Sequence, residues 1–293
     1  MRQYLVKCAK TLITDSNSSH KKLKTTLTIL LLIFLQLEII SQTAFSLRKS
    51  SVSLFLPRTA VPLQSSTSHI SKTSLSLTRN DPKKREDPDA ANWNIAALDM
   101  AADADYLTGI EKDVILEMNK VRTNPRKYAE LYIQPRLKYY RGKNYSVPGQ
   151  IAIITEEGTA AVNNCIAALR KTNPAGVLTP ERGLSLAAKD HVRDQSKTRQ
   201  IGHNGSDRST PEIRMKRYGV FSSSWRLAEN IIYGENTARD IVCGLLIDDG
   251  IPGRGHRANI MNKAFTQTGV AFGTHKLYRT SCTITYSHRY VSN

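Results

Sequence analysis

Three short stretches of this chain decide how it is interpreted: His203–Gly205 (HNG), Ala228–Ile231 (AENI) and Gly255–Asn262 (GHRANIMN). Each stretch sets a side chain capable of acid–base or metal chemistry in a turn-like or helix-edge context. Two imidazoles and a carboxylate that lie this far apart in the sequence meet in one cleft only if the fold brings them together. The three stretches therefore predict both a site and a fold that assembles it.

The order of these stretches, with Leu184–His191 ahead of them, resembles the CAP superfamily of cysteine-rich secretory proteins, antigen 5 and pathogenesis-related proteins. The resemblance covers roughly residues 108–290, and it is strongest to the cysteine-poor microbial branch. The ordered set of motifs is much more specific than any single motif. The resemblance implies an α/β fold, the three-layer α-β-α sandwich of the CAP (SCP) type.

The resemblance also implies a cleft with two histidines and two acids. His203 and His256 match the family's cleft histidines, and Glu229 matches its first acid. The second acid of the family lies before the second histidine in a Trp-x-x-Glu pattern, whose tryptophan is absent here. The end of that helix offers Asp249 as the second acid, with Asp248 as the alternative. The predicted cleft tetrad is His203, Glu229, Asp249 and His256.

The residue types in this tetrad suit metal binding. Glycines beside His203 and His256 let the backbone turn closely and are expected to expose both rings. Two neutral imidazoles can bind a divalent transition metal, and carboxylates complete or orient the ligand set. We therefore expect His203 and His256 to bind zinc or another divalent ion, and we expect no organic cofactor.

A binding role fits the sequence better than catalysis does. The chain has no Gly-x-Ser-x-Gly elbow, no His-Glu-x-x-His helix and no cysteine near either histidine, and Ser206 is only a weak nucleophile candidate. Members of the family are more often associated with lipid or partner binding. The predicted function is a secreted binding or effector module whose ligand is a lipid or a protein. A metal-dependent or His-assisted hydrolase acting at the same cleft is the alternative.

The remaining histidines and cysteines have structural interpretations. His191 shares an apolar helix face with Leu184 and is expected to be a core histidine, whereas His275 has no identifiable partner. Cys8 lies in the leader, which leaves three cysteines in the mature chain and at most one disulfide among them. We expect these three to be small buried hydrophobic residues; they are Cys165, Cys243 and Cys282.

The charge is unevenly distributed. The 293 residues carry 42 Lys and Arg against 25 Asp and Glu, a formal net charge of +17 at pH 7. Residues 1–80 contain eleven of the basic and two of the acidic side chains, so much of the excess belongs to the leader. The rest of the chain has no basic stripe interleaved with aromatic residues, which a nucleic-acid groove needs. No nucleic-acid partner is expected.

The leader has the order of an export signal. Lys21, Lys22 and Lys24 precede the apolar run Leu27–Leu35. That run is shorter than the roughly 20 residues of a spanning helix and suits a signal-peptide core. We expect residues 1–44 to be a signal peptide of a secreted protein, with transient or no membrane anchoring. A retained signal anchor is the alternative.

Between the leader and the domain, the composition predicts disorder. Residues 45–79 are rich in Ser, Thr and basic side chains and contain no acid, and a polar linker follows to residue 107. Such a segment cannot bury enough apolar surface to offset the entropy of ordering the chain. It also resembles the presequence of a complex plastid, a second possible destination. The CAP-type domain is expected to occupy residues 108–293.

Within that domain, helix signals precede strand signals. Thr108 and Glu111 form a capping-box pattern ahead of apolar residues at helical spacing. Further helices are expected at about 156–171, from 179 onward, from 210 to Gly219, and over 237–248. Gly269–Gly273 and Cys282–Tyr286 predict a hairpin. The insertion at residues 133–151, with Tyr139, Tyr140 and Tyr145, is expected to be a solvated loop or a partner surface.

Overall fold

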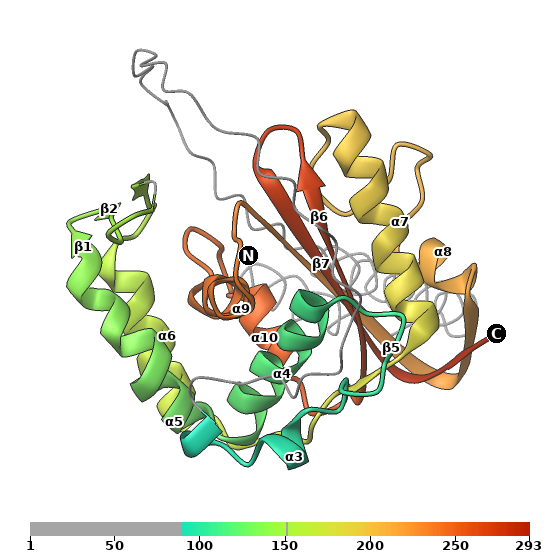
Figure 1. Ribbon diagram of the computed structural model, residues 1–293, viewed down its shortest axis with the longest axis horizontal. Helices are drawn as coiled ribbons and strands as arrows, with labels where there is room; N and C mark the ends of the chain where they lie inside the picture. The colour runs from blue at the N-terminus through green and yellow to red at the C-terminus, as the bar shows by residue number, and fades with distance from the viewer. Residues whose placement is uncertain (1–89, 151) are drawn as a thin grey trace, which may run out of the picture. The chain divides into compact units, whose positions relative to one another are not determined.

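The computed structural model describes residues 90–150 and 152–293, excepting the side chains of residues 223–225 (Figure 1). The expected signal segment at residues 1–44 and most of the expected disordered segment lie outside the described residues. The described helices are η1 Ala90–Asn92, α3 Ile95–Leu98, α4 Gly109–Thr123, α5 Pro125–Tyr128, π-helical η2 Ala129–Ile133, η3 Gln134–Tyr139, α6 Thr159–Lys171, α7 Arg182–Thr198, α8 Pro211–Lys216, α9 Ala238–Ile247 and α10 Gly255–Met261. The described strands are β1 Tyr140–Arg141, β2 Asn144–Tyr145, β3 Ile153–Ile154, β4 Thr179–Pro180, β5 Gly219–Tyr233, β6 Gln267–His275 and β7 Arg279–Ser292.

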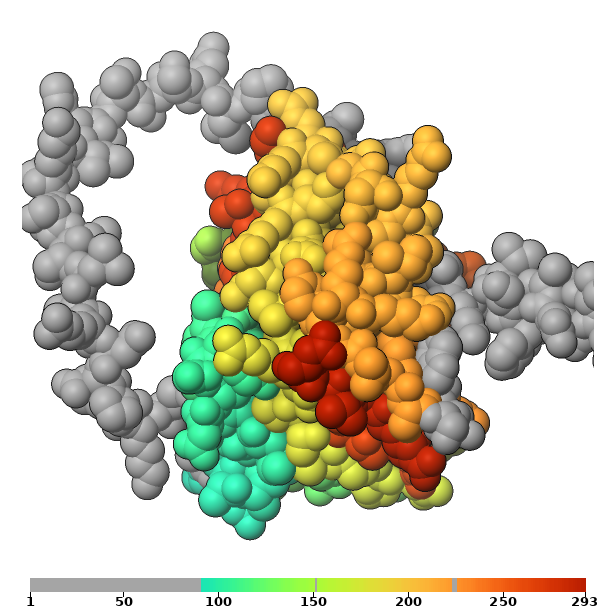
Figure 2. Space-filling model, turned by 90° about the vertical axis from the view of Figure 1, so that its right-hand side faces the viewer, coloured from blue at the N-terminus to red at the C-terminus, as the bar shows by residue number. Residues whose placement is uncertain are grey.

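The middle layer is a four-stranded sheet in the order β4-β6-β7-β5. Strands β6 and β7 form the expected antiparallel hairpin, and β5 runs antiparallel to β7 along one edge, with an irregularity between Phe221 and Arg226. Helices α4, α9 and α10 contact one face, and α7 and α8 contact the other. Figure 2 shows α7 in yellow beside the orange segment around α8 on that second face. The predicted α-β-α sandwich is confirmed.

Helix α4 anchors the first layer. The Thr108 backbone N–H donates to Glu111 Oε2 at 2.7 Å, and the other Glu111 oxygen accepts from the Phe272 N–H of β6 at 3.0 Å. The carboxylate that caps the helix therefore also fixes its start against the sheet. Val114 and Met118 on the inner face of this helix have no exposed surface. The predicted helix and its capping box are confirmed.

Helix α7 lies unusually close to the sheet. A Cβ placed on Gly269 of β6 would stand 2.2 Å from the backbone of Leu184 and Ser185. Only glycine permits this approach, because no real side-chain carbon tolerates such a distance. Leu184 is fully buried there beside Met215 of α8.

The expected linker up to residue 107 is wrong for its described part. Trp93, Leu98 and Leu107 are buried in the main core. The Trp93 indole N–H donates to Tyr132 Oη at 2.8 Å, which ties this segment to η2. These apolar residues are spaced without a helical or strand period, so the pattern does not show that the segment packs along the domain.

Two helices begin later than the sequence indicates. Helix α6 starts at Thr159 because Gly158, with φ of +61°, breaks the helical path after Glu156 and Glu157. Helix α7 starts at Arg182 because Thr179–Pro180 instead forms β4, paired parallel with β6. The predicted starts of α8 and α9 are confirmed: Thr210 and Thr237 cap them through their side-chain oxygens.

The described part of the insertion at residues 133–151 forms regular structure instead of a solvated loop. Strands β1, β2 and β3 form a small antiparallel sheet, and the rings of Tyr140 and Tyr145 lie 4.7 Å apart. Its use as a partner surface stays a prediction.

The three described cysteines are buried and unpaired, as expected of small hydrophobic residues. Burial raises the pKa of Cys165 to about 12, so its thiol stays protonated at neutral pH. Among residues 90–150 and 152–293, no helix has the length and apolar character needed to cross a bilayer.

Candidate functional site

Strand β5 carries the two side chains around which the site is built. Glu229 pairs with Thr285 across the strands and Asn230 with Ile284, so the two neighbours point to opposite faces of the sheet. Ile284 lies in the core under α4 and α9, whereas Thr285 donates to the Leu184 carbonyl of α7. Glu229 therefore faces α7 and α8, and Asn230 faces the opposite layer.

Glu229 is held on both oxygens. Its Oε1 lies 2.9 Å from His203 Nδ1, and its Oε2 accepts from Arg214 Nη2 of α8 at 2.7 Å. Arg214 Nη1 also donates to the His203 carbonyl at 3.0 Å, so Arg214 fixes both the loop and the strand. The side chains of Glu229 and Arg214 are 1% and 2% exposed and that of His203 is 9% exposed. The expectation of an openly exposed His203 ring is wrong, because these partners draw it inward.

The charge balance of this cluster favours an ionised Glu229. Burial alone would raise the pKa of Glu229, but the His203 hydrogen bond and the positive charge of Arg214 hold that pKa below its ordinary value. A carboxylate that stays charged inside a protein needs such partners. The cluster is therefore a buried anion shared by a guanidinium and an imidazole.

His191 lies behind this cluster and is buried, as predicted for a core histidine. Its Nε2 lies 2.7 Å from the Gly202 carbonyl, whereas its Nδ1 is buried with no hydrogen-bond partner in the described part of the chain. Burial lowers the pKa of His191, which favours the neutral ring.

The second histidine belongs to another pair. His256 Nδ1 lies 2.6 Å from Asp248 Oδ1, and the His256 backbone N–H donates to Asp248 Oδ2 at 2.9 Å. Both side chains have no exposed surface. The expected exposed ring at His256 is wrong, because the glycine-rich stretch continues into α10 and its first turn directs the ring inward. Within the described residues, His256 Nε2 is buried and has no hydrogen-bond partner.

The structure places Asp248, rather than Asp249, against His256. Asp248 ends α9 in the left-handed conformation, with φ of 55°, which turns its side chain toward the start of α10. Asp249 instead accepts from the backbone N–H groups of Glu156 at 2.6 Å and Glu157 at 2.9 Å. Asp249 therefore fixes the segment before α6, and the alternative considered for the second acid is the one in contact with the histidine.

Asn230 connects β5 to α10. Its Nδ2 donates to the His256 carbonyl at 3.1 Å, and its Oδ1 accepts from Asn259 at 2.8 Å. The two carboxylate–histidine pairs thus contact β5 through neighbouring residues, Glu229 and Asn230. Among the described residues no hydrogen bond or ion pair joins one pair to the other, and their convergence in one cleft stays a prediction.

Two residues of this arrangement were not foreseen. Asn230 was visible beside Glu229 in the AENI stretch, and its amide has the donors and acceptor that link two backbones. Arg214 had no signal, since it sits in a short polar helix between Glu212 and Lys216. Only the packing of α8 on the sheet shows that it reaches Glu229.

Two other candidates have different surroundings from those expected. The Ser206 hydroxyl donates to Asp194, which engages the candidate nucleophile in a loop contact. His275 has partners after all: its Nε2 lies 3.0 Å from the Gln200 carbonyl, and its Nδ1 accepts from the Leu277 N–H at 3.2 Å. It holds the turn of the β6–β7 hairpin.

Two features of these residues decide whether they could hold a divalent ion: the orientation of the histidine rings and the number of ligands placed together. A carboxylate that holds Nδ1 orients the other ring nitrogen as a metal ligand, and both His203 and His256 have this feature. The described chain contains no group of three or more His, Cys, Asp or Glu side chains placed to hold a metal. Each ring is therefore oriented as a single metal ligand, and the described residues offer no closed four-ligand zinc site.

Residues 164–286 match the model of the cysteine-rich secretory protein family, CAP. This match supports the resemblance to the CAP superfamily for that segment. The matched segment contains both carboxylate–histidine pairs, whereas α4 and the small β1-β2-β3 sheet precede it.

Two solved structures are similar to part of this chain. An outer surface protein from Borrelia burgdorferi is 17% identical, with a TM-score of 0.33, over 39% of this chain and 80% of that one. An extracellular protein containing an SCP domain from Bacillus anthracis is 20% identical, with a TM-score of 0.31, over 43% of this chain and 38% of that one. No curated protein matches the sequence.

Proposed function

We propose that this CAP protein is an exported, non-enzymatic binding module whose site is built from its two carboxylate–histidine pairs. One observation carries the proposal: both carboxylate oxygens of Glu229 already have a partner. His203 is the partner of one oxygen, and Arg214 is the partner of the other. A carboxylate fixed in this way orients an imidazole for binding. It is poorly placed to exchange protons with a substrate, because its partners stabilise the ionised form.

The surroundings of the candidate nucleophiles support the same proposal. The Ser206 hydroxyl is engaged by Asp194, and the three described cysteines are buried with raised pKa values, which suppress the reactive thiolate. The second histidine pair is fully buried. The Asp248 carboxylate holds the Nδ1 atom of His256, which orients the ring for binding.

A divalent ion belongs to this proposal as the group that the oriented histidines would hold. His203 and His256 are the residues that would hold it, with Glu229 and Asp248 orienting the two rings. When bound, such an ion supplies open coordination positions for a donor atom of the ligand. The protein's own contribution is to orient both imidazoles and to shield them from solvent.

Export and ligand class complete the proposal. The Lys-flanked apolar run at Leu27–Leu35 supports passage through the secretory route. A lipid or a partner protein is the ligand class that family membership favours. Fusing residues 1–44 to a fluorescent reporter tests the first part: secretory labelling is expected, and uniform cytosolic fluorescence would contradict export.

Hydrolysis of p-nitrophenyl esters tests binding against catalysis. The full chain should give no turnover that depends on the histidines, so the wild type and a His203→Ala, His256→Ala double variant should release nitrophenol at equal rates. A rate in the wild type that the double variant loses, with folding retained by circular dichroism, would favour the hydrolase. Phosphatidylcholine vesicles added to the same two proteins separate a lipid ligand from a protein ligand by co-sedimentation.

A further inference from the structure

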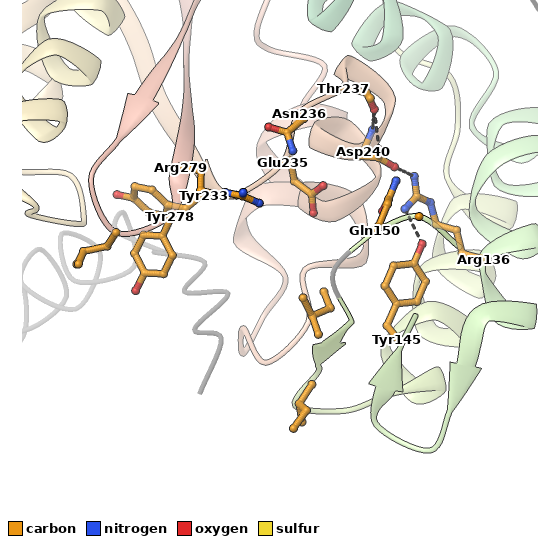
Figure 3. Close-up of a pocket in the computed structure, with 15 residues that line it drawn as sticks. Arg136, Tyr145, Gln150, Tyr233, Glu235, Asn236, Thr237, Asp240, Tyr278 and Arg279 are labelled. Atoms are coloured by element: carbon orange, nitrogen blue, oxygen red, sulfur yellow. Dashed lines mark hydrogen bonds and ion pairs between the residues drawn. The ribbon is translucent and has the colours of Figure 1, made fainter. Parts of the chain in front are cut away.

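A second site lies at the other end of α9 from Asp248. A cavity of about 370 Å³ opens between the small β1-β2-β3 sheet, the β5–α9 connection and the β6–β7 turn (Figure 3). Helix α9 has ten residues and so separates this cavity from Asp248 by about 15 Å. No residue of the two carboxylate–histidine pairs lines it. Its volume falls in the range of small-molecule sites, roughly 300 to 1,000 Å³.

The walls of the cavity are aromatic and apolar. Tyr145 comes from β2, Tyr233 ends β5, and Tyr278 lies in the hairpin turn. The rings of Tyr233 and Tyr278 lie 5.3 Å apart. Ile154 and Leu277 line the same cavity, and they are 65% and 56% exposed. An aromatic-walled cavity with apolar residues open to solvent suits a ligand with an aromatic or alkyl body.

One pair of charges in the cavity is already neutralised. Arg136 forms an ion pair with Asp240 and donates to Tyr145 Oη at 3.1 Å. Asp240 also accepts from Thr237 Oγ1 at 2.7 Å. The Arg136 guanidinium is therefore held by its own partners and is not available to a second carboxylate.

Glu235 is the acidic residue of the cavity lining that lies outside the Arg136–Asp240 pair. Figure 3 shows it between the side formed by Tyr233 and Tyr278 and the side formed by Arg136 and Tyr145. In the described part of the chain, only its backbone carbonyl receives a hydrogen bond, from Thr280, and its carboxylate contacts no cation. Burial raises the pKa of Glu235 to about 7, an effect that Asp240 increases and Arg136 opposes. Among the described residues the partly buried Glu235 carboxylate has no hydrogen-bond donor, so it is open to a ligand that brings one.

We propose that this cavity binds a small organic ammonium ion with an aromatic or alkyl body, and that Glu235 is its counter-ion. An ammonium group supplies both the positive charge and the hydrogen-bond donors that the Glu235 carboxylate lacks. The tyrosine faces add attraction for a cation. An anionic ligand would meet two carboxylates, Glu235 and Asp240, and a neutral alcohol would leave the ionised carboxylate uncompensated.

The charged and titratable groups around Glu235 favour this choice. The tyrosines that face it have raised pKa values and remain neutral, so Glu235 is the group in the cavity that titrates near pH 7; they are Tyr140, Tyr145 and Tyr233. The other surrounding groups are Arg136 and Asp240, which form a pair, Tyr278, and the exposed Arg279 at the hairpin turn. Ammonium binding should therefore strengthen as pH rises through about 7.

Calorimetric titration of the full chain with phenethylamine tests the proposal, with phenethyl alcohol as the neutral ligand of the same shape. At pH 8 we expect the amine to bind at least about tenfold more tightly than the alcohol. The wild-type affinity for the amine should fall by roughly thirtyfold between pH 8 and pH 5.5, because the binding-competent ionised fraction of Glu235 falls. Equal affinity for the two ligands, or an amine affinity independent of pH, would overturn the proposal.

The variant Glu235→Gln should lose most of the amine affinity while keeping that for the alcohol within about twofold. Glu212→Gln removes the same charge from an exposed pair with Lys216 and should bind the amine as the wild type does. The His203→Ala, His256→Ala double variant should also retain amine binding, so a failure of the proposed function is distinguishable from a failure here. Undiminished amine binding by a folded Glu235→Gln protein contradicts the proposal, and the wild-type comparison of amine with alcohol remains decisive if that variant does not fold.

Discussion

At the scale of single residues, the site depends on carboxylates that differ in what holds them. Glu229 is buried between a guanidinium and an imidazole, which lowers its pKa. Glu235 is partly buried, the described residues give it no such partners, and its pKa rises to about 7. The same side chain thus serves as a fixed anion in one place and as a titrating group in the other, because only its neighbours differ.

Replacing Arg214 by methionine should destabilise the protein by about 3 to 5 kcal/mol, since it leaves the buried Glu229 charge without its guanidinium partner. Lys216→Met, two residues away on the same helix, removes an exposed pair with Glu212 and should cost no more than about 0.5 kcal/mol. Urea unfolding of both variants gives the comparison. Equal losses would show that Arg214 does not support Glu229 as described.

The Glu235→Gln variant should change the dependence of stability on pH. In the folded protein Glu235 keeps its proton up to about pH 7. In the unfolded chain Glu235 loses this proton near its ordinary pKa of 4.5. Wild-type stability from this group is therefore present below about pH 4.5 and is lost as the pH rises to 7. At pH 8 the variant should be more stable by up to about 3 kcal/mol, and the difference should vanish near pH 4. A constant difference across that range in thermal unfolding would contradict the raised pKa.

The sequence predicted His203, Glu229 and His256 because each sits in an ordered motif. It favoured Asp249 over Asp248, whereas the structure places Asp248 against His256, because successive residues at a helix end point about 100° apart and the left-handed conformation of Asp248 decides the direction. Arg214 was missed because its role depends on a contact with Glu229 that no local pattern encodes.

At the scale of elements, the layers are held by close approaches between helices and strands. Helix α7 lies against β6 at Gly269, and α10 is held to β5 by Asn230. Asn230 of β5 holds the His256 pair through the His256 carbonyl. Glu229, the preceding residue of β5, is itself part of the His203 pair. The positions of α7 and α10 therefore determine whether the site forms.

Gly269→Ala tests the first approach. The added methyl group would stand 2.2 Å from the backbone of Leu184 and Ser185, so α7 must move and the loss should be about 2 kcal/mol or more. Gly109→Ala, at the start of α4, has nothing within 4 Å of the new carbon and should be neutral or slightly stabilising. If both substitutions leave the midpoint of chemical unfolding unchanged, α7 does not lie against β6 as closely as described.

Three helices with a capping residue at their start were predicted from the sequence. Strand β5, which depends on pairing with β7, was not. The caps at Thr108, Thr210 and Thr237 marked three helix starts correctly. Strand β5 was missed because Glu229 and Asn230 interrupt its apolar pattern and its register is irregular after Phe221. Its stability comes from pairing with β7, which a single sequence does not show.

At the scale of the whole molecule, an α-β-α sandwich carries two separate candidate ligand sites. The matched family segment at residues 164–286 holds both histidine pairs, whereas the cavity around Glu235 also draws on the small sheet ahead of that segment. The family resemblance predicted the sandwich, and it could not predict the cavity, because Arg136 and Tyr145 lie outside the matched segment.

Zinc titration of the full chain by calorimetry tests the central claim, that two oriented histidines form a binding site. The wild type should bind zinc, the His203→Ala, His256→Ala double variant should lose that binding, and His288→Ala, a histidine of β7 outside both pairs, should retain it. Since ligating imidazoles must be neutral, the zinc affinity should weaken when the solution is acidified. Equal zinc affinity in the wild type and the double variant, or no binding by the wild type at neutral pH, would contradict the account.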